Sequence, residues 1–180
     1  RSNLVSQIAP YNVNFAITSN GGLPITTNST IVNLTGTAPP AVASISVNGI
    51  NQKISFASET AWTARIGLPP GTNALVVVGY DWRGNAIATS GVTVTVSAIA
   101  PSPVEQIILT EIMYNPLRPG AEYVELYNRS TNNTFDLRGW RLNGADITFD
   151  GGSIMAPGQY AVVAQNLTTY QLTYSNAEAV

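Results

Sequence analysis

The stretch ALVVVGYDWRGNAIATSGVTVTVS, residues 74–97, decides the fold class. Its last part alternates valine with threonine, so that Val92, Val94 and Val96 define one apolar face of a strand and the threonines a solvated one. The turn residues Gly84 and Asn85 separate this run from the apolar run 74–81. The stretch therefore predicts two strands of an antiparallel sheet, 74–81 and 92–97.

Similar short runs fill the region before it. We expect strands at 30–37, 43–47, 53–57 and 62–68, separated by the turn sequences Pro39-Pro40, Asn48-Gly49 and Pro69-Pro70-Gly71. Together they predict one β-sandwich over residues 23–98. Residues 1–22 are expected to form a short helix at 2–9, ended by Pro10, followed by an extended segment or linker.

A second β-rich unit is expected at 106–180, after a proline-containing linker at 99–105. Its predicted strands are 107–114, 122–128, 139–142, 147–149 and 160–164, whereas 166–174 fits either a capped helix or an irregular loop. Ser, Thr and Asn supply 50 of the 180 residues, which favours strands and turns over helices. The prediction is an all-β chain of two immunoglobulin-like sandwiches in tandem.

Composition excludes several kinds of chemistry. The chain contains no histidine and no cysteine, so a disulfide, a thiolate nucleophile, a histidine base and a Cys/His zinc site are all excluded. No glycine-rich stretch has the pattern and lysine of a phosphate-binding loop. The net charge of −2 argues against nucleic-acid binding, and no apolar run approaches the roughly 20 residues of a membrane span. We expect no catalysis and no cofactor.

Four motifs of the second unit occur in a recognisable order: ILTEIMYNP (108–116), EYVELYN (122–128), FDLRGWRLNG (135–144) and APGQYAVVA (156–164). They resemble the lamin tail domain, and the bacterial versions most closely. The resemblance implies a small immunoglobulin-like sandwich that acts as a non-enzymatic interaction or surface module. The family's sandwich usually has further strands, so we expect the second sandwich to be incomplete at Val180.

The first unit, with VNG (47–49), PPGTN (69–73) and DWRGN (81–85), is similar to bacterial immunoglobulin-like repeats. The order of the two units, with the segment 11–22, resembles the tail that follows a spore-coat-H-like kinase domain in large exported bacterial proteins. This implies a kinase-like domain upstream, an extracellular or cell-surface location, and an unknown protein or cell-surface polymer as partner.

Acidic residues are the only candidates for a catalytic or metal site. Strand parity places Glu122 and Glu125 on opposite faces. It places Glu111 on the face of Ile107, Leu109 and Met113. A carboxylate buried there would need an arginine, Arg129 or Arg141, as its partner. The alternative is a calcium site formed by Glu111, Glu125 and a loop carbonyl, although calcium prefers six or more oxygens.

Aromatic residues offer a second kind of site. We expect Trp62 and Trp140 to fill the two cores and Trp82 to be exposed beside its turn. Trp82 is then a candidate surface contact, together with the strand residues Tyr123, Glu125 and Tyr127. The alternative is a sugar-stacking platform formed by Trp62, Tyr80, Trp82 and Trp140.

These observations favour a non-catalytic spacer and adhesion or protein-interaction arm of a larger exported protein. The alternatives are a carbohydrate-binding accessory module and a fragment of a kinase-like protein. The edge of strand 160–164 would expose unpaired backbone groups. We expect either that residues 166–174 fold back over it or that a second copy pairs with it by strand addition, giving a homodimer.

Overall fold

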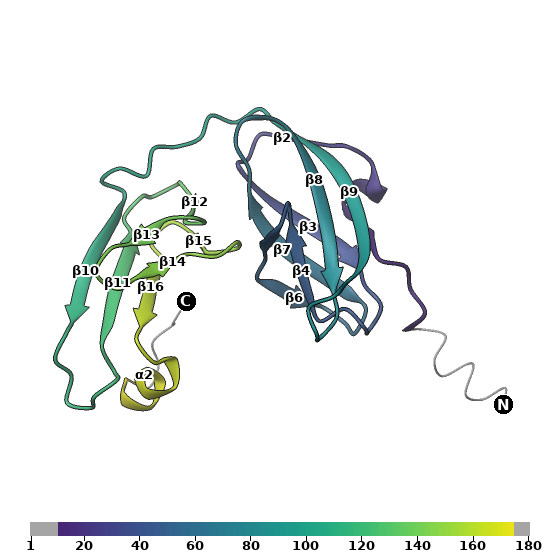
Figure 1. Cartoon of the computed structure of the whole chain (residues 1–180). Coiled ribbons are helices and arrows are strands. Elements are labelled where there is room, and N and C mark those ends of the chain that lie inside the picture. Colours follow the sequence, from purple (N-terminus) through teal and green to yellow (C-terminus); the bar gives the residue numbers. More distant parts are fainter. Residues whose placement is uncertain (1–10, 175–180) are drawn as a thin grey trace. The chain divides into compact units, whose positions relative to one another are not determined.

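The computed structural model describes residues 11–174, so the helix expected at 2–9 lies outside the described residues. These residues form mostly strands and one α-helix (Figure 1). The all-β class predicted from the sequence is therefore confirmed. Two compact units are present: one contains the residues up to Ala100 together with Asp150–Gly152, and the other contains Pro101–Phe149 and the residues from Ser153 onward.

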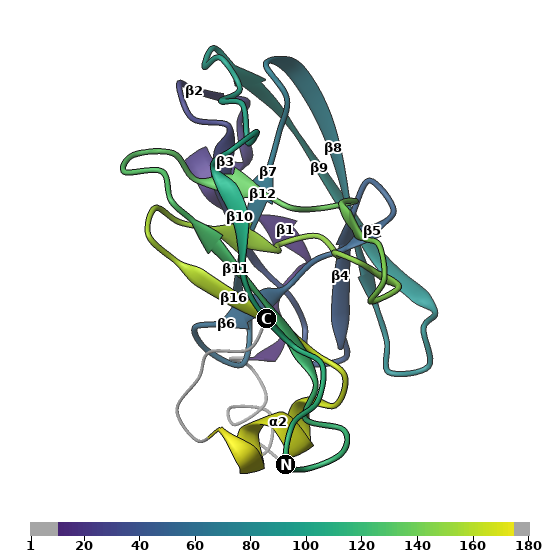
Figure 2. The ribbon, with the colours of Figure 1, turned by 90° about the vertical axis from the view of Figure 1, so that its left-hand side faces the viewer.

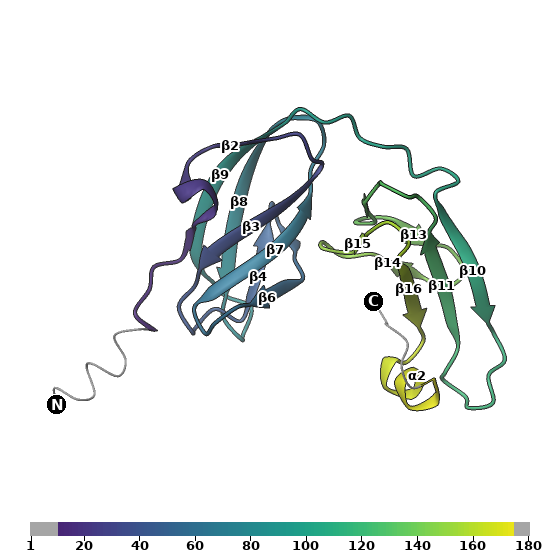
Figure 3. The same ribbon diagram turned by 180° about the vertical axis from the view of Figure 1, so that it is seen from behind.

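The first unit is a sandwich of two sheets (Figure 3). One sheet has the order β1 (Ala16–Ile17), β3 (Ile31–Thr37), β7 (Ala61–Gly67), β6 (Ile54–Phe56). The other has the order β2 (Ile25–Thr27), β9 (Ala86–Val96), β8 (Gly71–Tyr80), β4 (Ser44–Val47), β5 (Ile50–Asn51). Neighbouring strands are antiparallel except β2 and β9, and a short 3-10 turn, η2 (Ser19–Gly22), precedes β2.

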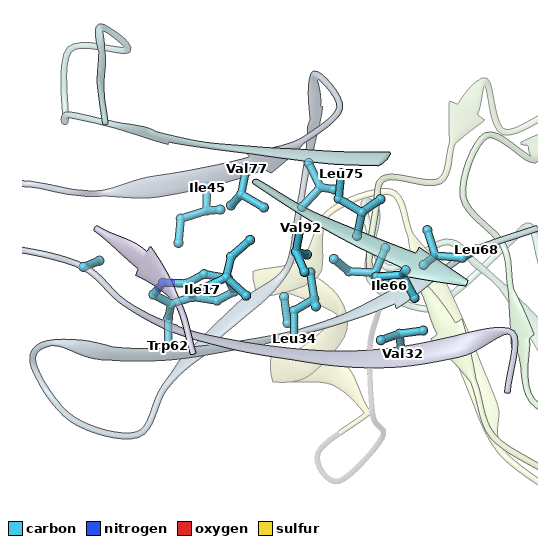
Figure 4. Close-up of a cluster of buried hydrophobic side chains, with 14 of the residues drawn as sticks. Ile17, Val32, Leu34, Ile45, Trp62, Ile66, Leu68, Leu75, Val77 and Val92 are labelled. Carbon is cyan, nitrogen blue, oxygen red and sulfur yellow. The ribbon is translucent and has the colours of Figure 1, made fainter. Parts of the chain in front are cut away.

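The inner faces of these sheets form one hydrophobic core, part of which Figure 4 shows. Alternation along the strands explains its composition, because Val92, Val94 and Val96 are buried while the threonines between them are not fully buried. Trp62 is fully buried, as predicted, and its indole N–H donates to the Thr37 carbonyl at 3.2 Å. The core therefore buries its largest aromatic ring without leaving the polar N–H unsatisfied.

The segment from Tyr11 to Gly22 is more than the extended linker expected from the sequence. Ile17 pairs with Gly36 in the β1–β3 ladder and its side chain is buried in the first core. The Phe15 ring stacks on Trp62 at 6.4 Å between centroids. The alternating apolar residues of this segment predict an extended chain, and in the structure part of that chain forms an edge strand of the sandwich.

Strand β9 begins at Ala86, six residues before the predicted start at Val92. The reason is the long β8–β9 ladder, which runs from Gly71↔Val96 to Tyr80↔Ala86. Ser90 and Gly91 interrupt the apolar alternation in the sequence but remain paired with β8. Backbone pairing therefore extends the strand beyond the residues whose side chains are buried.

The second unit contains a three-stranded antiparallel sheet of order β10 (Ile107–Met113), β11 (Tyr123–Asn128), β16 (Tyr160–Ala164), visible in Figure 2. Two short ladders complete it: β12 (Phe135–Asp136) with β15 (Ile154–Met155), and β13 (Arg141–Leu142) with β14 (Ile147–Thr148). The segment that fitted a helix or a loop forms a helix, α2 (Leu167–Thr173), whose N-cap Asn166 accepts from Thr169 N at 2.9 Å.

The second core lies between the three-stranded sheet and the short ladders, and its buried members are Leu126, Phe135, Leu137, Phe149, Met155, Ala161 and Val163. Trp140 is not among them, since 39% of it is exposed. The prediction that Trp140 is a core residue was wrong. The predicted strand 139–142 begins only at Arg141, after a turn in which Gly139 has φ 77° and Trp140 N donates to Leu137 O.

Candidate functional site

A β-bulge in β10 decides where the two glutamates of the predicted site lie. Leu109 pairs with Leu126, but the next paired residue, Glu111, is directly opposite Glu125. The extra residue is Thr110, and it moves Glu111 to the other face of the sheet. Glu111 therefore shares its face with Glu125 and, as expected, with Met113. The expectation that it also lies with Ile107 and Leu109 was wrong.

This outer face also carries the tyrosines predicted as contacts. Tyr123, Glu125 and Tyr127 alternate along β11, as expected, and lie opposite Ala164, Val162 and Tyr160 of β16. The Tyr127 and Tyr160 rings stack at 4.4 Å between centroids. At the other end, Tyr170 of α2 packs edge-on against Tyr123 at 5.2 Å, so α2 lies against this end of the outer face.

Neutral hydroxyl groups, and not arginines, contact the two carboxylates. Thr110 Oγ1 donates to Glu125 Oε1 at 2.6 Å. Burial and then a hydrogen bond to Glu111 raise the pKa of Tyr123 above its ordinary value. Burial and then the negative charges of Glu125 and Glu111 likewise raise the pKa of Tyr170. The outer face is therefore acidic and rich in phenol donors.

The ion pairs expected for Glu111 do not form within residues 11–174. Arg141 binds Asp146, and the other ion pair in this part of the chain joins Arg138 to Asp136. No group of three or more acidic side chains suited to a metal ion occurs in the described part of the chain. The structure thus brings Glu111 and Glu125 together as an opposed pair of like charges, an arrangement that is unfavourable without a cation or a donor nearby.

The inner face of the same sheet contains a pocket of about 610 Å³ at the end where β10 ends and β11 begins. Ile112, Val124 and Val163 of the sheet form one part of its wall, and Gly144–Ile147 at the β13–β14 turn forms another. Glu122 also lines it, and its Oε2 is buried and accepts no hydrogen bond from any described residue. This site was not predicted from the sequence, although Glu122 has the same parity as Val124 and Leu126.

Trp82 lies at the tip of the β8–β9 turn in the first unit. Trp82 is 78% exposed, as predicted, and the Arg83 guanidinium lies 4.6 Å from the centroid of its ring. A cation over an indole face is an attractive contact. The Arg83 guanidinium therefore covers one side of the Trp82 ring, which is the candidate contact surface. Trp62 is fully buried and so cannot belong to a sugar-stacking surface.

None of the helices described in residues 11–174 combines the length and apolar character needed to cross a bilayer. No curated protein matches the chain. Among solved structures, a fibronectin(III)-like module of Clostridium thermocellum CbhA shares 16% identity, covers 47% of this chain and 98% of its own, and superposes with a TM-score of 0.35.

A second solved structure, the SGBP-B protein of a Bacteroides ovatus mixed-linkage glucan utilization locus in complex with a mixed-linkage heptasaccharide, shares 12% identity. It covers 83% of this chain and the match spans 47% of its own length, with a TM-score of 0.27. The family comparison concerns the second unit. Residues 100–179 match the family model described as Lamin Tail Domain, which supports a lamin tail domain in the part of the chain that carries β10, β11, β16 and both candidate faces.

Proposed function

We propose that the chain is a non-catalytic pair of β-sandwich modules of a larger exported bacterial protein, and that its second unit binds a partner protein through β10. One observation carries this proposal. β10 is an edge strand, and Leu109 and Ile112, whose faces point toward the sandwich interior, are 50% and 61% exposed. Tyr114 and Leu117, which follow β10, are exposed as well.

Such an edge is unusual for a protein that acts alone. Native edge strands are commonly short, charged or covered, because unpaired backbone groups next to apolar side chains pair with other chains. β10 has seven residues, and its one charged side chain, Glu111, lies on the outer face. An added strand would bind the free backbone groups and cover Leu109 and Ile112 at the same time.

The test uses fluorescently labelled chain and intact cells of the bacterium that encodes it, with binding measured by flow cytometry. We expect binding that protease treatment of the cells removes. The double variant Leu109→Lys/Ile112→Lys should lose it, whereas Leu172→Lys, which places one lysine at an exposed leucine of α2, should keep it. Binding that survives protease, or that the double variant retains, would contradict a protein partner at β10.

A carbohydrate-binding module is the second candidate, and the Tyr127–Tyr160 stack favours it. The two rings lie on the outer face, and Tyr160 is 49% exposed, so a flat aromatic surface is open to a ligand. On this alternative, periodate oxidation of the cells and not protease would abolish binding. Tyr160→Ala should then reduce the signal on a glycan array, and Tyr114→Ala, a change at an exposed tyrosine away from the stack, should not.

Two wider parts of the proposal rest on the sequence resemblance. An extracellular or cell-surface location is expected from the kind of exported protein that the order of the units resembles, and labelling of intact cells with an antibody against the chain tests it. A kinase-like domain upstream of Arg1 is the remaining alternative for the parent protein, and the complete reading frame tests it. The absence of histidine and cysteine supports a non-catalytic role for the chain itself.

A further inference from the structure

We propose that the pocket on the inner face of the second unit's sheet receives a lysine or arginine side chain of the partner polypeptide, with Glu122 as its charge partner. This inference rests on the proposed function, because it assigns the feature that the bound protein must have. Ile112 connects the two sites, since it belongs to the exposed β10 edge and also lines the pocket. A chain that pairs with β10 therefore lies beside the opening of the pocket.

The walls of the pocket suit an aliphatic stem. Ile112, Val124 and Val163 come from three neighbouring strands, and Ile147 comes from β14. A volume of about 610 Å³ lies within the range of sites that hold small molecules or parts of a peptide. Lysine and arginine bury their methylene stems against apolar surface and keep the charged head at a polar group, which fits such a wall with one carboxylate.

Glu122 supplies that polar group. Its Oε2 is buried without a hydrogen bond from the described residues, and a buried acceptor left unpaired costs free energy. The other acidic residue of the lining, Asp146, already binds Arg141. The lining contains no basic side chain, so a cation from outside would give Glu122 the partner that it lacks.

Charge and coordination favour a cationic side chain over the other classes of ligand. Residues 104–180 contain eight acidic and four basic residues, so the unit as a whole attracts a basic partner. A purely apolar side chain would leave the Glu122 carboxylate without a charge partner. A calcium ion would need six or more oxygens, and the acidic side chains that line the pocket are only two.

A peptide array tests the inference with the full chain. The probes are nine-residue peptides with valine, isoleucine or threonine at the flanking positions and arginine, lysine, glutamine or glutamate at the centre. We expect the arginine and lysine peptides to bind at least about tenfold more tightly than the glutamine peptides, and the glutamate peptides to bind least, as is typical for a buried charge-assisted hydrogen bond. Amide chemical-shift changes should include Val124, Ile147 and Val163.

The decisive comparison is between two variants of the same sheet. Glu122→Gln should abolish the preference for a basic centre, whereas Glu111→Gln removes the same charge from the outer face and should leave the preference unchanged. Thermal melting of both variants at the same temperature as the unaltered chain shows that folding is intact. Equal binding of basic and neutral peptides, no binding to the chain, or a preference that survives Glu122→Gln overturns the inference. The double variant at Leu109 and Ile112 changes the pocket as well as the edge, because Ile112 lines the pocket. Leu109→Lys alone lies outside the pocket lining, so its effect on cell binding separates failure of the proposed function from failure of this inference.

Discussion

Gly36 lies directly opposite Trp62 in the β3–β7 ladder, and a Cβ atom at Gly36 would lie 2.4 Å from the indole ring and 2.4 Å from the Ala16 carbonyl oxygen. The backbone of β3 thus approaches the largest side chain of the first core as closely as only glycine permits. β1 and Trp62 occupy the two sides of this position. Close packing, and not a turn conformation, therefore requires glycine at position 36.

We expect Gly36→Ala to destabilise the first unit by about 1–3 kcal/mol or more, because overpacking of a filled core forces side chains and backbone to shift. Urea unfolding followed by far-ultraviolet circular dichroism measures the loss. Trp62→Leu in the same chain should reduce the additional cost of Gly36→Ala, since the smaller side chain leaves room for the methyl group. An equal cost in both backgrounds would place the strain at Ala16 instead.

The two predicted core tryptophans should respond differently to truncation. Trp62→Ala should cost about 3–5 kcal/mol, as for other buried large aromatics. Trp140→Ala should cost clearly less, because a turn and not a strand holds this residue and much of its side chain contacts solvent. Thermal melting of both variants checks the order. A larger loss for Trp140→Ala would show that the turn, and not the core, limits stability.

These cases show what the sequence could and could not reveal. The alternation of Val92, Val94 and Val96 with threonine predicts a strand with one buried face. This prediction is possible because the residue types themselves indicate which side chains are buried. The bulge at Thr110 leaves no trace in composition, yet it reverses the face on which Glu111 lies. Glu122 was placed on the correct face by parity, but its pocket depends on the distant segment Gly144–Ile147, which no local pattern connects with it.

Asp81 should make the β8–β9 turn sensitive to acid. The Asn85 side-chain amide, followed by the Asn85 backbone N–H, lowers the pKa of Asp81 below its ordinary value of 3.8. A group whose pKa is lower in the folded state stabilises the protein above its ordinary pKa, and this contribution is lost as the pH falls through the lowered folded value. Carbon-detected NMR titration of the Asp81 carboxyl group should give the low value.

The matched variant for this turn is Asp81→Asn. It keeps an oxygen that can accept from Arg83 N and Asn85 N, the bonds that Asp81 Oδ1 makes at 2.9 and 2.8 Å, and it removes the titration. The pH dependence of its stability in the acid range should therefore lack the contribution of residue 81. A titration of Asp81 at or above 3.8 would contradict the expected role of Asn85.

Asn128 should be essential for the second core. It is fully buried, and its amide nitrogen donates to the carbonyls of Asn133, Met155 and Ala156 at 2.9–3.1 Å while Oδ1 accepts from Ser130 N. Asn128→Leu would leave these groups unpaired, and we expect a loss of about 1–3 kcal/mol or more. Asn128→Asp should be worse, because a carboxylate would face the same carbonyls. Differential scanning calorimetry on the full chain measures both.

The last prediction concerns the free edge of β16. Helix α2 folds back so that Tyr170 packs on Tyr123, but this contact lies on the outer face. The backbone N–H groups of Tyr170 and Tyr174 donate to carbonyls within the same segment. β16 therefore remains an edge strand of its sheet within the described residues. We expect a strand-addition homodimer that dissociates on dilution, measurable by sedimentation at several concentrations.

A proline can test that pairing without breaking the existing ladder. Gln159 O accepts a hydrogen bond from Asn128 N of β11, and Gln165 N donates to Glu122 O, just before β11. Because successive residues of a strand direct their backbone groups to opposite sides, the N–H of Ala164 points toward the free edge. Ala164→Pro should weaken the dimer and leave the monomer folded, whereas Gln165→Pro should damage the β11–β16 ladder itself. A monomer at every concentration would show that the edge does not pair with a second copy. A dimer that Ala164→Pro leaves unchanged would place the contact elsewhere, with the exposed β10 edge as the next strand to vary, through Leu109→Lys.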